Sequence, residues 1–563
     1  MNPTTKTLSA LIIAIGISAS TASAQGGPPP PPPPLPDPVA PTENPTTPQK
    51  VALGKILFFE EQLSSDDTVA CATCHTPTAS FTDVRPAVNP GPDGLMQTPD
   101  DIFASLGVLR ADVVGDYQPD PRFGFNTQVT GRRTPEVFAA LYAPETFWDG
   151  RGTDTFLDPQ TGAISIATGG ALESQAVGPL MNDAEMAHEN RDWGMVTTKL
   201  VDVRPLALAT NLTPDIATAL LADSTYPELF ETAFGTPAIT AERIGFAIAA
   251  YERTLVPNQA PVDAFAAGNP NALTQNQTMG WHQFSGPARC NLCHTPPFFT
   301  DNQFHNLGLR PTTEDNGRQG VTGLFADRGK FKTPSLRNAG LRSRFFHNGQ
   351  ANVLDNGPAP GGVDDIYIAG GGPFPDNRDP LLLPLGGMPG INMANIMDFV
   401  GNALTDPRVA QGLPPFDGPT LFSETNPGGE AAELFGPANP GGNGVMPRLL
   451  CATPPVRGSQ SFKVGMIDAP TTAAIAWLAV SLNRSSATWQ GGYLLNLQQP
   501  LFATYNAPLQ GTGNADGHAT FHLDLPDFPG LSGMGVNVQG FVHDSTAPGG
   551  RAASSRGASY LIP

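Results

Sequence analysis

The sequence predicts a mainly α-helical protein of two related domains, followed by a small C-terminal β-sandwich-like domain. Three observations predict this fold class: apolar residues recur at helical spacing through 47–410, one cysteine motif occurs twice, and the last part of the chain alternates apolar and polar residues. A helix repeats about every 3.6 residues and a half-buried strand every two, so the two patterns separate the helical part from the tail.

The first 46 residues predict a leader and a spacer. Residues 1–24 contain Lys6, the apolar stretch ALIIAIG and the small-residue ending Ala22-Ser23-Ala24, which together are typical of a cleaved secretory signal peptide. Residues 25–46 form a Pro-rich linker, and such a run favours an extended conformation that cannot pack a core. We therefore expect a periplasmic or secreted protein.

An N-terminal domain is predicted over 47–235. Its first helix follows the linker directly, because Thr47 can cap it and Pro48 suits the first helical position. The first cysteine motif comes after this helix. Residues 84–130 are rich in Pro, Gly and Asp, which indicates a long surface insertion.

A second, C-terminal domain of the same kind is predicted over 236–424. Apolar residues recur at helical spacing in ITAERIGFAIAAYERTLV at 239–256 and in NMANIMDFVGNALTD at 392–406. Short stretches rich in Gly and Pro lie between these runs. The sequence therefore predicts helices joined by loops over this range.

The tail, 425–563, predicts a β-rich domain of unassigned role. Phe521, Leu523 and Leu525 alternate with polar residues, and turn-forming residues separate this run from similar ones. Such alternation is typical of strands with one buried face.

Composition narrows the classes of function. The chain has 31 Lys and Arg against 51 Asp and Glu, giving a net charge of −20, which argues against nucleic acid as a partner. The acidity suits a basic partner protein, although it also keeps an exported protein soluble. No internal apolar run reaches the length of a membrane span. Four of the five cysteines lie in two short motifs, which is unlike a disulfide scaffold.

The two motifs resemble each other beyond their cysteines. CATCHTPTASFTD at 71–83 and CNLCHTPPFFTD at 290–301 share Cys-x-x-Cys-His-Thr-Pro and a following Phe-Thr-Asp. Zinc sites usually draw their cysteine pairs from nearby turns, and a redox dithiol needs no histidine after it. A covalently attached haem accounts for every residue of the motif. Two thiols one helical turn apart face the same way, and the histidine that follows them can reach the iron.

We therefore expect two covalently bound haem c groups. The first would be held by Cys71, Cys74 and His75. The second would be held by the residues that match them, which are Cys290, Cys293 and His294.

At this point the sequence resembles the bacterial di-haem cytochrome c peroxidase family, including its tryptophan-tryptophylquinone-maturing branch. The phrases that carry the resemblance cover about 47–410 in order: LGKILFFEEQLSSDDTVACATCHTPTASFTD, RRTPEVFAALYAPETFWDGR, ALESQAVGPLMNDAEM, ITAERIGFAIAAYERTLV, CNLCHTPPFFTDNQFHNLGL, FKTPSLRNAGLRSRFFHNGQ and YIAGGGP. The stretch 84–130 and the tail lie outside it.

The resemblance implies roles around the first haem. Trp148 matches a tryptophan that the family keeps between the haems, where it would shorten the electron-transfer steps. Gln175, Pro179 and Glu185 match the family's distal pocket, where a carboxylate moves a proton between the two peroxide oxygens. Many family peroxidases also place a histidine ligand soon after the first motif. This chain has no histidine between His75 and His188, so we expect the first haem to be open at rest.

The resemblance also implies ligands for the second haem. Tyr367 matches the position of its sixth ligand, which is Met in typical peroxidases and Tyr in the maturing branch. Met388 is the alternative. A tyrosinate lowers an iron's reduction potential and a thioether raises it.

Other matched residues are expected to play supporting parts. His305, Arg337 and His347 would contact the propionates or nearby loops. The family often binds calcium between its domains, but the matching asparagine is Arg133 here, which places the calcium in doubt.

The resulting hypothesis is a cytochrome c peroxidase-like oxidoreductase. Electrons from a small donor protein, a basic cytochrome or a copper protein, would reduce hydrogen peroxide to water. Two alternatives stay open: a di-haem oxidase that acts on a protein substrate by long-range electron transfer, and a non-catalytic di-haem electron carrier. The family resemblance also allows a homodimer.

Overall fold

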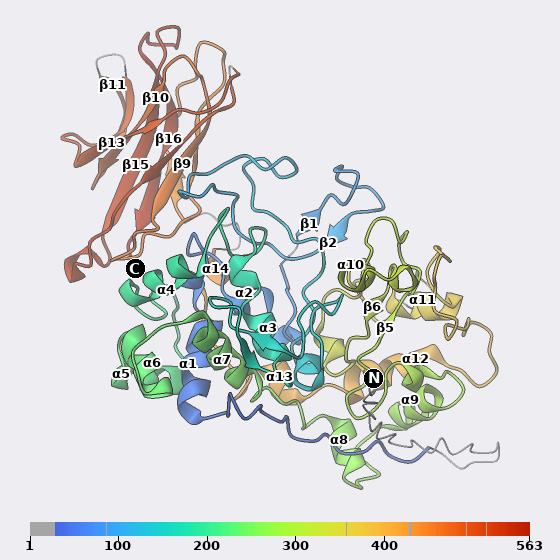
Figure 1. Ribbon diagram of the computed structural model, residues 1–563. Coiled ribbons are helices and arrows are strands. Elements are labelled where there is room, and N and C mark those ends of the chain that lie inside the picture. Colours follow the sequence, from blue (N-terminus) through green and yellow to red (C-terminus); the bar gives the residue numbers. More distant parts are fainter. Residues whose placement is uncertain are drawn as a thin grey trace, which may run out of the picture.

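The computed structural model describes residues 29–563 apart from 86, 356, 358, 427–430, 491–492 and 514. The predicted signal peptide lies outside these residues. A helical part with small hairpins is followed by a β-rich part, which stands to one side of the helices in Figure 1. Within the described ranges, no helix combines the length and apolar character needed to cross a membrane.

The first helix pair is α1, Pro48–Phe58, and α7, Ala241–Glu252. As predicted, the Thr47 hydroxyl caps α1 by accepting from the Lys50 N–H at 3.3 Å. The two helices pack closely, because a Cβ on Gly54 would overlap the carbonyl oxygen of Ala247. The helices between them along the chain are α2 Cys71–Cys74, α3 Ala171–Ala176, α4 Trp193–Asp202, α5 Pro214–Ala222 and α6 Tyr226–Phe234.

The second helix pair repeats this arrangement with α9, Gln275–Ser285, and α12, Met393–Asp398. A Cβ on Gly280 would overlap the carbonyl oxygen of Asn395, so a glycine again sets the crossing. The helix predicted over 392–406 changes to a π-helix at Phe399–Ala403. The remaining helices are α8 Pro261–Ala266, α10 Gln319–Thr322, α11 Val363–Ala369, α13 Pro407–Gln411 and α14 Phe422–Thr425.

Among the described residues, the helical part contains three antiparallel two-stranded sheets. They are β1 Val88–Asn89 with β2 Ile102–Phe103, β3 Phe156–Leu157 with β4 Ile164–Ile166, and β5 Phe304–His305 with β6 Phe331–Lys332. The first of them gives the stretch 84–130 a structure of its own.

The β-rich part contains a five-stranded sheet in the order β13-β10-β15-β16-β7, a three-stranded sheet in the order β14-β9-β8, and the hairpin β11-β12. Its strands are β7 Glu433–Phe435, β8 Arg448–Leu450, β9 Lys463–Ala469, β10 Ile475–Ser481, β11 Arg484–Gln490, β12 Tyr493–Leu497, β13 Ala503–Pro508, β14 Gly517–His522, β15 Gly535–His543 and β16 Ala552–Leu561. One apolar core joins the two larger sheets, with Phe521 from β14 packed in the same cluster as Val538 and Val542 from β15.

The stretch 84–130 holds the β-rich part against the helices, and Figure 1 shows it running between them. The buried Tyr117 hydroxyl lies 2.9 Å from Thr453 Oγ1. Lys463 Nζ donates to the Gly115 carbonyl at 2.6 Å. Side chains of the β-rich part therefore form hydrogen bonds with the stretch 84–130.

Candidate functional site

The first cysteine motif forms a short helix, α2, that presents its two thiols one turn apart. The backbone N–H of His75 closes the turn on the Cys71 carbonyl at 2.9 Å. The imidazole Nδ1 lies 3.0 Å from the Phe81 carbonyl. Because a carbonyl only accepts, Nδ1 carries the proton and Nε2 keeps its lone pair.

The second motif has the same local geometry. His294 N–H bonds the Cys290 carbonyl at 2.9 Å, and His294 Nδ1 lies 3.1 Å from the Phe299 carbonyl. Burial lowers the pKa of His294 to about 4 and also lowers the pKa of His75. Both imidazoles are therefore neutral and suited to bind a metal ion through Nε2.

The donor sets at both motifs fit a covalently attached haem. Each motif offers two thiols and one neutral imidazole, and each borders a cavity, of about 510 Å³ at the first motif and about 190 Å³ at the second. Among the described residues, none of the four motif cysteines forms a disulfide. Their thiols are therefore available for attachment.

The first cavity brings together most of the residues that the sequence singled out. Its lining includes Cys71, Cys74, His75, Trp148, Gln175, Pro179 and Glu185. Gln175 comes from the last turn of α3, and Pro179 begins the 3₁₀ turn Pro179–Met181. Two short elements thus carry these side chains to the cavity.

Glu185 follows that turn and is half-buried. Its backbone N–H donates to the Asn182 carbonyl at 3.1 Å, and the Asn182 amide donates to Glu185 Oε1 at 3.3 Å. Burial raises the pKa of Glu185, and the Arg151 guanidinium offsets part of this rise. A raised pKa makes it easier for a carboxylate to take up a proton, which general acid–base catalysis at this position requires.

Met96 and His188 lie away from this cavity. Met96 is 58% exposed, and His188 directs Nδ1 toward the Glu189 carbonyl at 2.9 Å. Neither is among the described residues that line the cavity.

The second cavity separates the two ligand candidates. Tyr367, on α11, lines it together with Cys290 and His294. Met388 is not among the described residues that line it, although it packs against the same apolar cluster. Burial raises the pKa of Tyr367, and the neighbouring cysteines add to this rise. Met393 and Met397, which belong to the helical pattern at 392–406, also line the cavity.

Trp148 lines both cavities. Its indole N–H donates to the Arg133 carbonyl at 2.6 Å, which fixes the orientation of the ring. The His347 ring lies edge-on at 6.3 Å and is itself stacked on Phe331 at 3.6 Å. The indole is thus held where the two cavities meet.

Arg133 fills the place at which the family resemblance suggested a calcium ligand. Its buried guanidinium donates to the Asp83 carbonyl and to Ser343 Oγ. Arg342 lies nearby and donates to the carbonyls of Ser335 and Arg337. Calcium needs several oxygen ligands, and here guanidinium groups occupy such oxygens. The residues present therefore do not fit a calcium ion.

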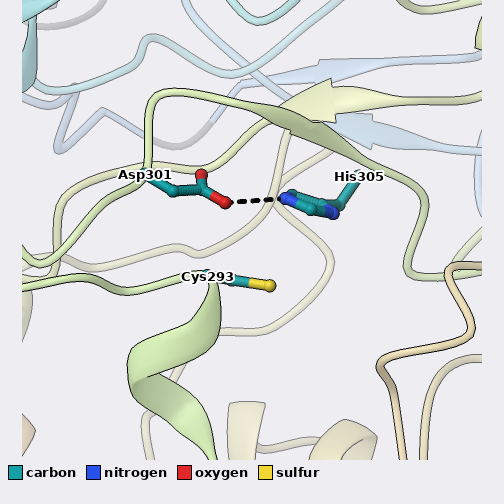
Figure 2. A group of neighbouring side chains, drawn as sticks. All are labelled: Cys293, Asp301 and His305. Atoms are coloured by element: carbon teal, nitrogen blue, oxygen red, sulfur yellow. Dashed lines mark hydrogen bonds and ion pairs between the residues drawn. The ribbon is translucent and has the colours of Figure 1, made fainter. Parts of the chain in front are cut away.

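A charged cluster lies beside the second cysteine of each motif. Figure 2 shows Cys293, Asp301 and His305, whose ligand atoms lie within 4.8 Å of one another. His305 Nε2 lies 2.9 Å from Asp301 and Nδ1 lies 2.6 Å from Asp379. Bonding to Asp301 is the main cause that raises the pKa of His305, to about 11. An imidazolium that donates hydrogen bonds from both ring nitrogens has no lone pair left for a metal ion. This cluster is therefore an ion-pair network.

The first motif carries a counterpart of this network. Asp83, which matches Asp301 in the shared Phe-Thr-Asp, pairs with Arg85 at 2.8 Å. Arg85 in turn lies 3.4 Å from the Cys74 sulfur. The repeated aspartate was the sequence signal for both networks. It holds a cation next to the second cysteine of each motif.

Arg337 contributes to the scaffold around the second motif. It is buried and pairs with Asp263 at 2.8 Å, while its Nε donates to the Pro297 carbonyl at 3.0 Å. Arg337 and His305 therefore have protein partners of their own.

The chain is similar to several known proteins. A family model described as di-haem cytochrome c peroxidase matches residues 48–271. The methylamine utilization protein MauG of Methylorubrum extorquens is 31% identical over 333 residues, covering 59% of this chain and 72% of that protein. Cytochrome c peroxidase Ccp of Escherichia coli is 29% identical over 322 residues, covering 56% of this chain and 53% of that protein. A solved MauG-like protein associated with microbial copper homeostasis has a TM-score of 0.49 and 22% identity, covering 69% of this chain and 97% of that chain.

Proposed function

This chain belongs to the di-haem cytochrome c peroxidase family, and from that premise we propose that it reduces hydrogen peroxide to water with electrons from a small redox protein such as cytochrome c. The observation that carries the proposal is the first cavity, where Glu185 lies among the same lining residues as Cys71, Cys74 and His75. Exported location is proposed from residues 1–24, and the acidic chain suits a basic donor protein.

Each group in the first cavity has a distinct part in this proposal. Haem c, attached at Cys71 and Cys74 and held by His75, would supply the redox chemistry. Glu185 accepts a proton from one peroxide oxygen and returns it to the other, which its raised pKa permits. The net reaction consumes two electrons and two protons for each peroxide and releases two waters.

The neighbouring residues shape the cavity around Glu185. Pro179 has no N–H and no side-chain donor, so it keeps its side of the cavity apolar. Gln175 offers an amide that can orient the peroxide by hydrogen bonding. Trp148 lies between the cavities and would carry electrons from the second motif toward the first.

The test is peroxide-dependent oxidation of reduced cytochrome c by the holoprotein and by Glu185→Gln. We expect the variant to lose roughly 10²- to 10⁴-fold in kcat, as is typical when a positioned proton-transfer group is removed. Glu189→Gln, on the exposed side of the same segment, is the matched control and should behave like the wild type. Haem absorbance must stay the same in all three proteins. An unchanged rate in Glu185→Gln would contradict the proposed role.

One observation favours a second candidate, an oxidase that acts on a protein substrate. Tyr367 rather than Met388 lines the second cavity, and a phenolate ligand would lower the potential of the second haem. Such an enzyme would stay oxidised for long after addition of peroxide and turn over small donors slowly. A spectroscopic peroxide titration followed by reduced cytochrome c separates the two candidates. An electron carrier without catalytic activity would show no turnover after addition of either peroxide or reduced cytochrome c.

A further inference from the structure

A second carboxyl group borders the first cavity and has no part in the function proposed above. Glu252 is the last residue of α7 and is only 3% exposed. It lines the cavity together with Ile248, one turn earlier on the same helix. Its Oε2 atom is buried and has no hydrogen-bond partner among the described residues. An unpaired buried carboxyl oxygen is costly and calls for a physical reason.

Arg253, the cationic residue that follows Glu252 in sequence, is already paired with another acid. Arg253, the next residue, binds Glu173 through two bonds of 2.8 and 2.9 Å. Glu173 also accepts from the Asn44 amide at 2.7 Å, and Lys50 donates to Asn44 Oδ1 at 2.9 Å. The ion-pair network on this side of α7 thus closes on Glu173 and leaves Glu252 outside it.

The lysines of α1, the helix that packs against α7, also bind residues other than Glu252. Besides Lys50, α1 carries Lys55, which pairs with Asp215 and Asp417 at 2.8 Å each. Burial is the main cause that raises the pKa of Glu252, to about 8; Glu173 raises it further and Arg253 opposes the rise. At neutral pH most Glu252 side chains are therefore neutral carboxylic acids.

Glu252 and Glu185 both lie near the Cys71 end of the cavity. Burial raises the pKa of the Cys71 thiol, and the charges of both glutamates raise it further, with Glu252 the stronger of the two. Both carboxyl groups thus lie within electrostatic range of one sulfur atom. Their environments differ, because Glu185 is half-buried near Arg151 whereas Glu252 is fully buried. Two acids with different environments in one cavity can divide the work of proton transfer.

We propose that Glu252 is a proton reservoir for the first cavity, supplying one of the two protons that peroxide reduction consumes. The inference rests on the proposed peroxidase function. Glu185 moves the proton that completes the first water, so the neutral carboxyl of Glu252 gives its proton to the remaining oxygen, which takes up two protons and two electrons and leaves as the second water. The resulting carboxylate is reprotonated from solvent. The two electrons come from the donor protein, so the step needs no further reactant. Glu185 keeps its own proton transfer between the two peroxide oxygens.

The test compares Glu252→Gln and Glu252→Asp holoproteins with the wild type. Wild-type kcat should fall as the pH rises through about 8, where the reservoir loses its proton. Glu252→Gln should lose roughly 10²-fold in kcat at neutral pH, the low end for a positioned proton donor, and should lose the alkaline limb of the profile. Glu252→Asp, which keeps an acid, should recover part of the rate. Infrared difference spectra at two pH values that bracket 8 should show a carboxylic acid band that is missing from Glu252→Gln.

Glu61→Gln is the matched control. Glu61 is also a buried carboxyl with a raised pKa, of about 7, but it accepts from the N–H groups of Phe422 and Ser423 and does not line either cavity. Its variant should keep the wild-type profile. A Glu252→Gln protein with the wild-type rate and alkaline limb would overturn the reservoir while leaving the peroxidase proposal intact. A wild-type protein that cannot reduce peroxide would instead overturn the peroxidase proposal, and the reservoir with it.

Discussion

Replacing Glu252 by glutamine should change how the stability of the holoprotein depends on pH. The folded state raises the pKa of this carboxyl from 4.5 to about 8 because the group is buried without a partner. Folding therefore favours the protonated form. Stability from this group is fully present below pH 4.5 and is lost as the pH rises to about 8. At about 1.4 kcal/mol for each pKa unit, the loss is about 5 kcal/mol.

The assay is urea unfolding followed by fluorescence at a series of pH values from below 4.5 to above 8. Glutamine cannot ionise, so Glu252→Gln should match the wild type at the acidic end and exceed its free energy of unfolding at the alkaline end. Glu61→Gln should instead change the curve between 4.5 and about 7. Parallel curves for wild type and Glu252→Gln would contradict this prediction, because the carboxyl would then titrate alike in folded and unfolded chains.

Three further outcomes follow from the contacts. Glu173→Gln leaves the buried Arg253 without its charge partner and should lower the free energy of unfolding by about 3–5 kcal/mol, measured in urea. Tyr117→Phe removes the buried hydrogen bond to Thr453 and should cost about 1 kcal/mol, seen as faster proteolysis of the β-rich part. Tyr367→Phe removes the phenol from the second cavity and should change the absorption spectrum and reduction potential of the second haem alone.

A control variant and a contrary outcome test the predictions for Tyr367 and Tyr117. Met388→Ala should leave the spectrum of the second haem unchanged, because Met388 does not line the cavity. A spectral change in this variant, with none in Tyr367→Phe, would reverse the choice of ligand. Equal proteolysis rates in Tyr117→Phe and the wild type would show that the contact with the β-rich part contributes little.

Features that depend on local geometry could be predicted from the sequence. The cap of α1 by Thr47 and the start at Pro48 follow from hydrogen bonding within one turn, and the structure confirms both. The motif spacing sets two thiols and an imidazole on one turn in each half of the chain. Family membership followed from the order of several such segments, and the comparisons confirm it.

Other features depend on which distant segments meet. The composition of 84–130 predicted a surface insertion, but not that it would pair with Thr453 and Lys463 of the β-rich part. The helical pattern at 392–406 did not predict the π-helix at Phe399–Ala403, which has the same apolar residues with a different hydrogen-bond register.

Residues close together in the chain specify the chemistry that could be present, namely two Cys-x-x-Cys-His sites and a set of acids. Which of these acids is paired depends instead on the packing of distant segments. Glu173 receives Arg253 whereas Glu252, the residue next to Arg253, stays unpaired at a cavity wall. The reason is physical, since desolvation and ion pairing depend on every segment that packs around a group and not on its neighbours in sequence. The same holds for Trp148, whose place between two cavities arises where both halves of the chain meet.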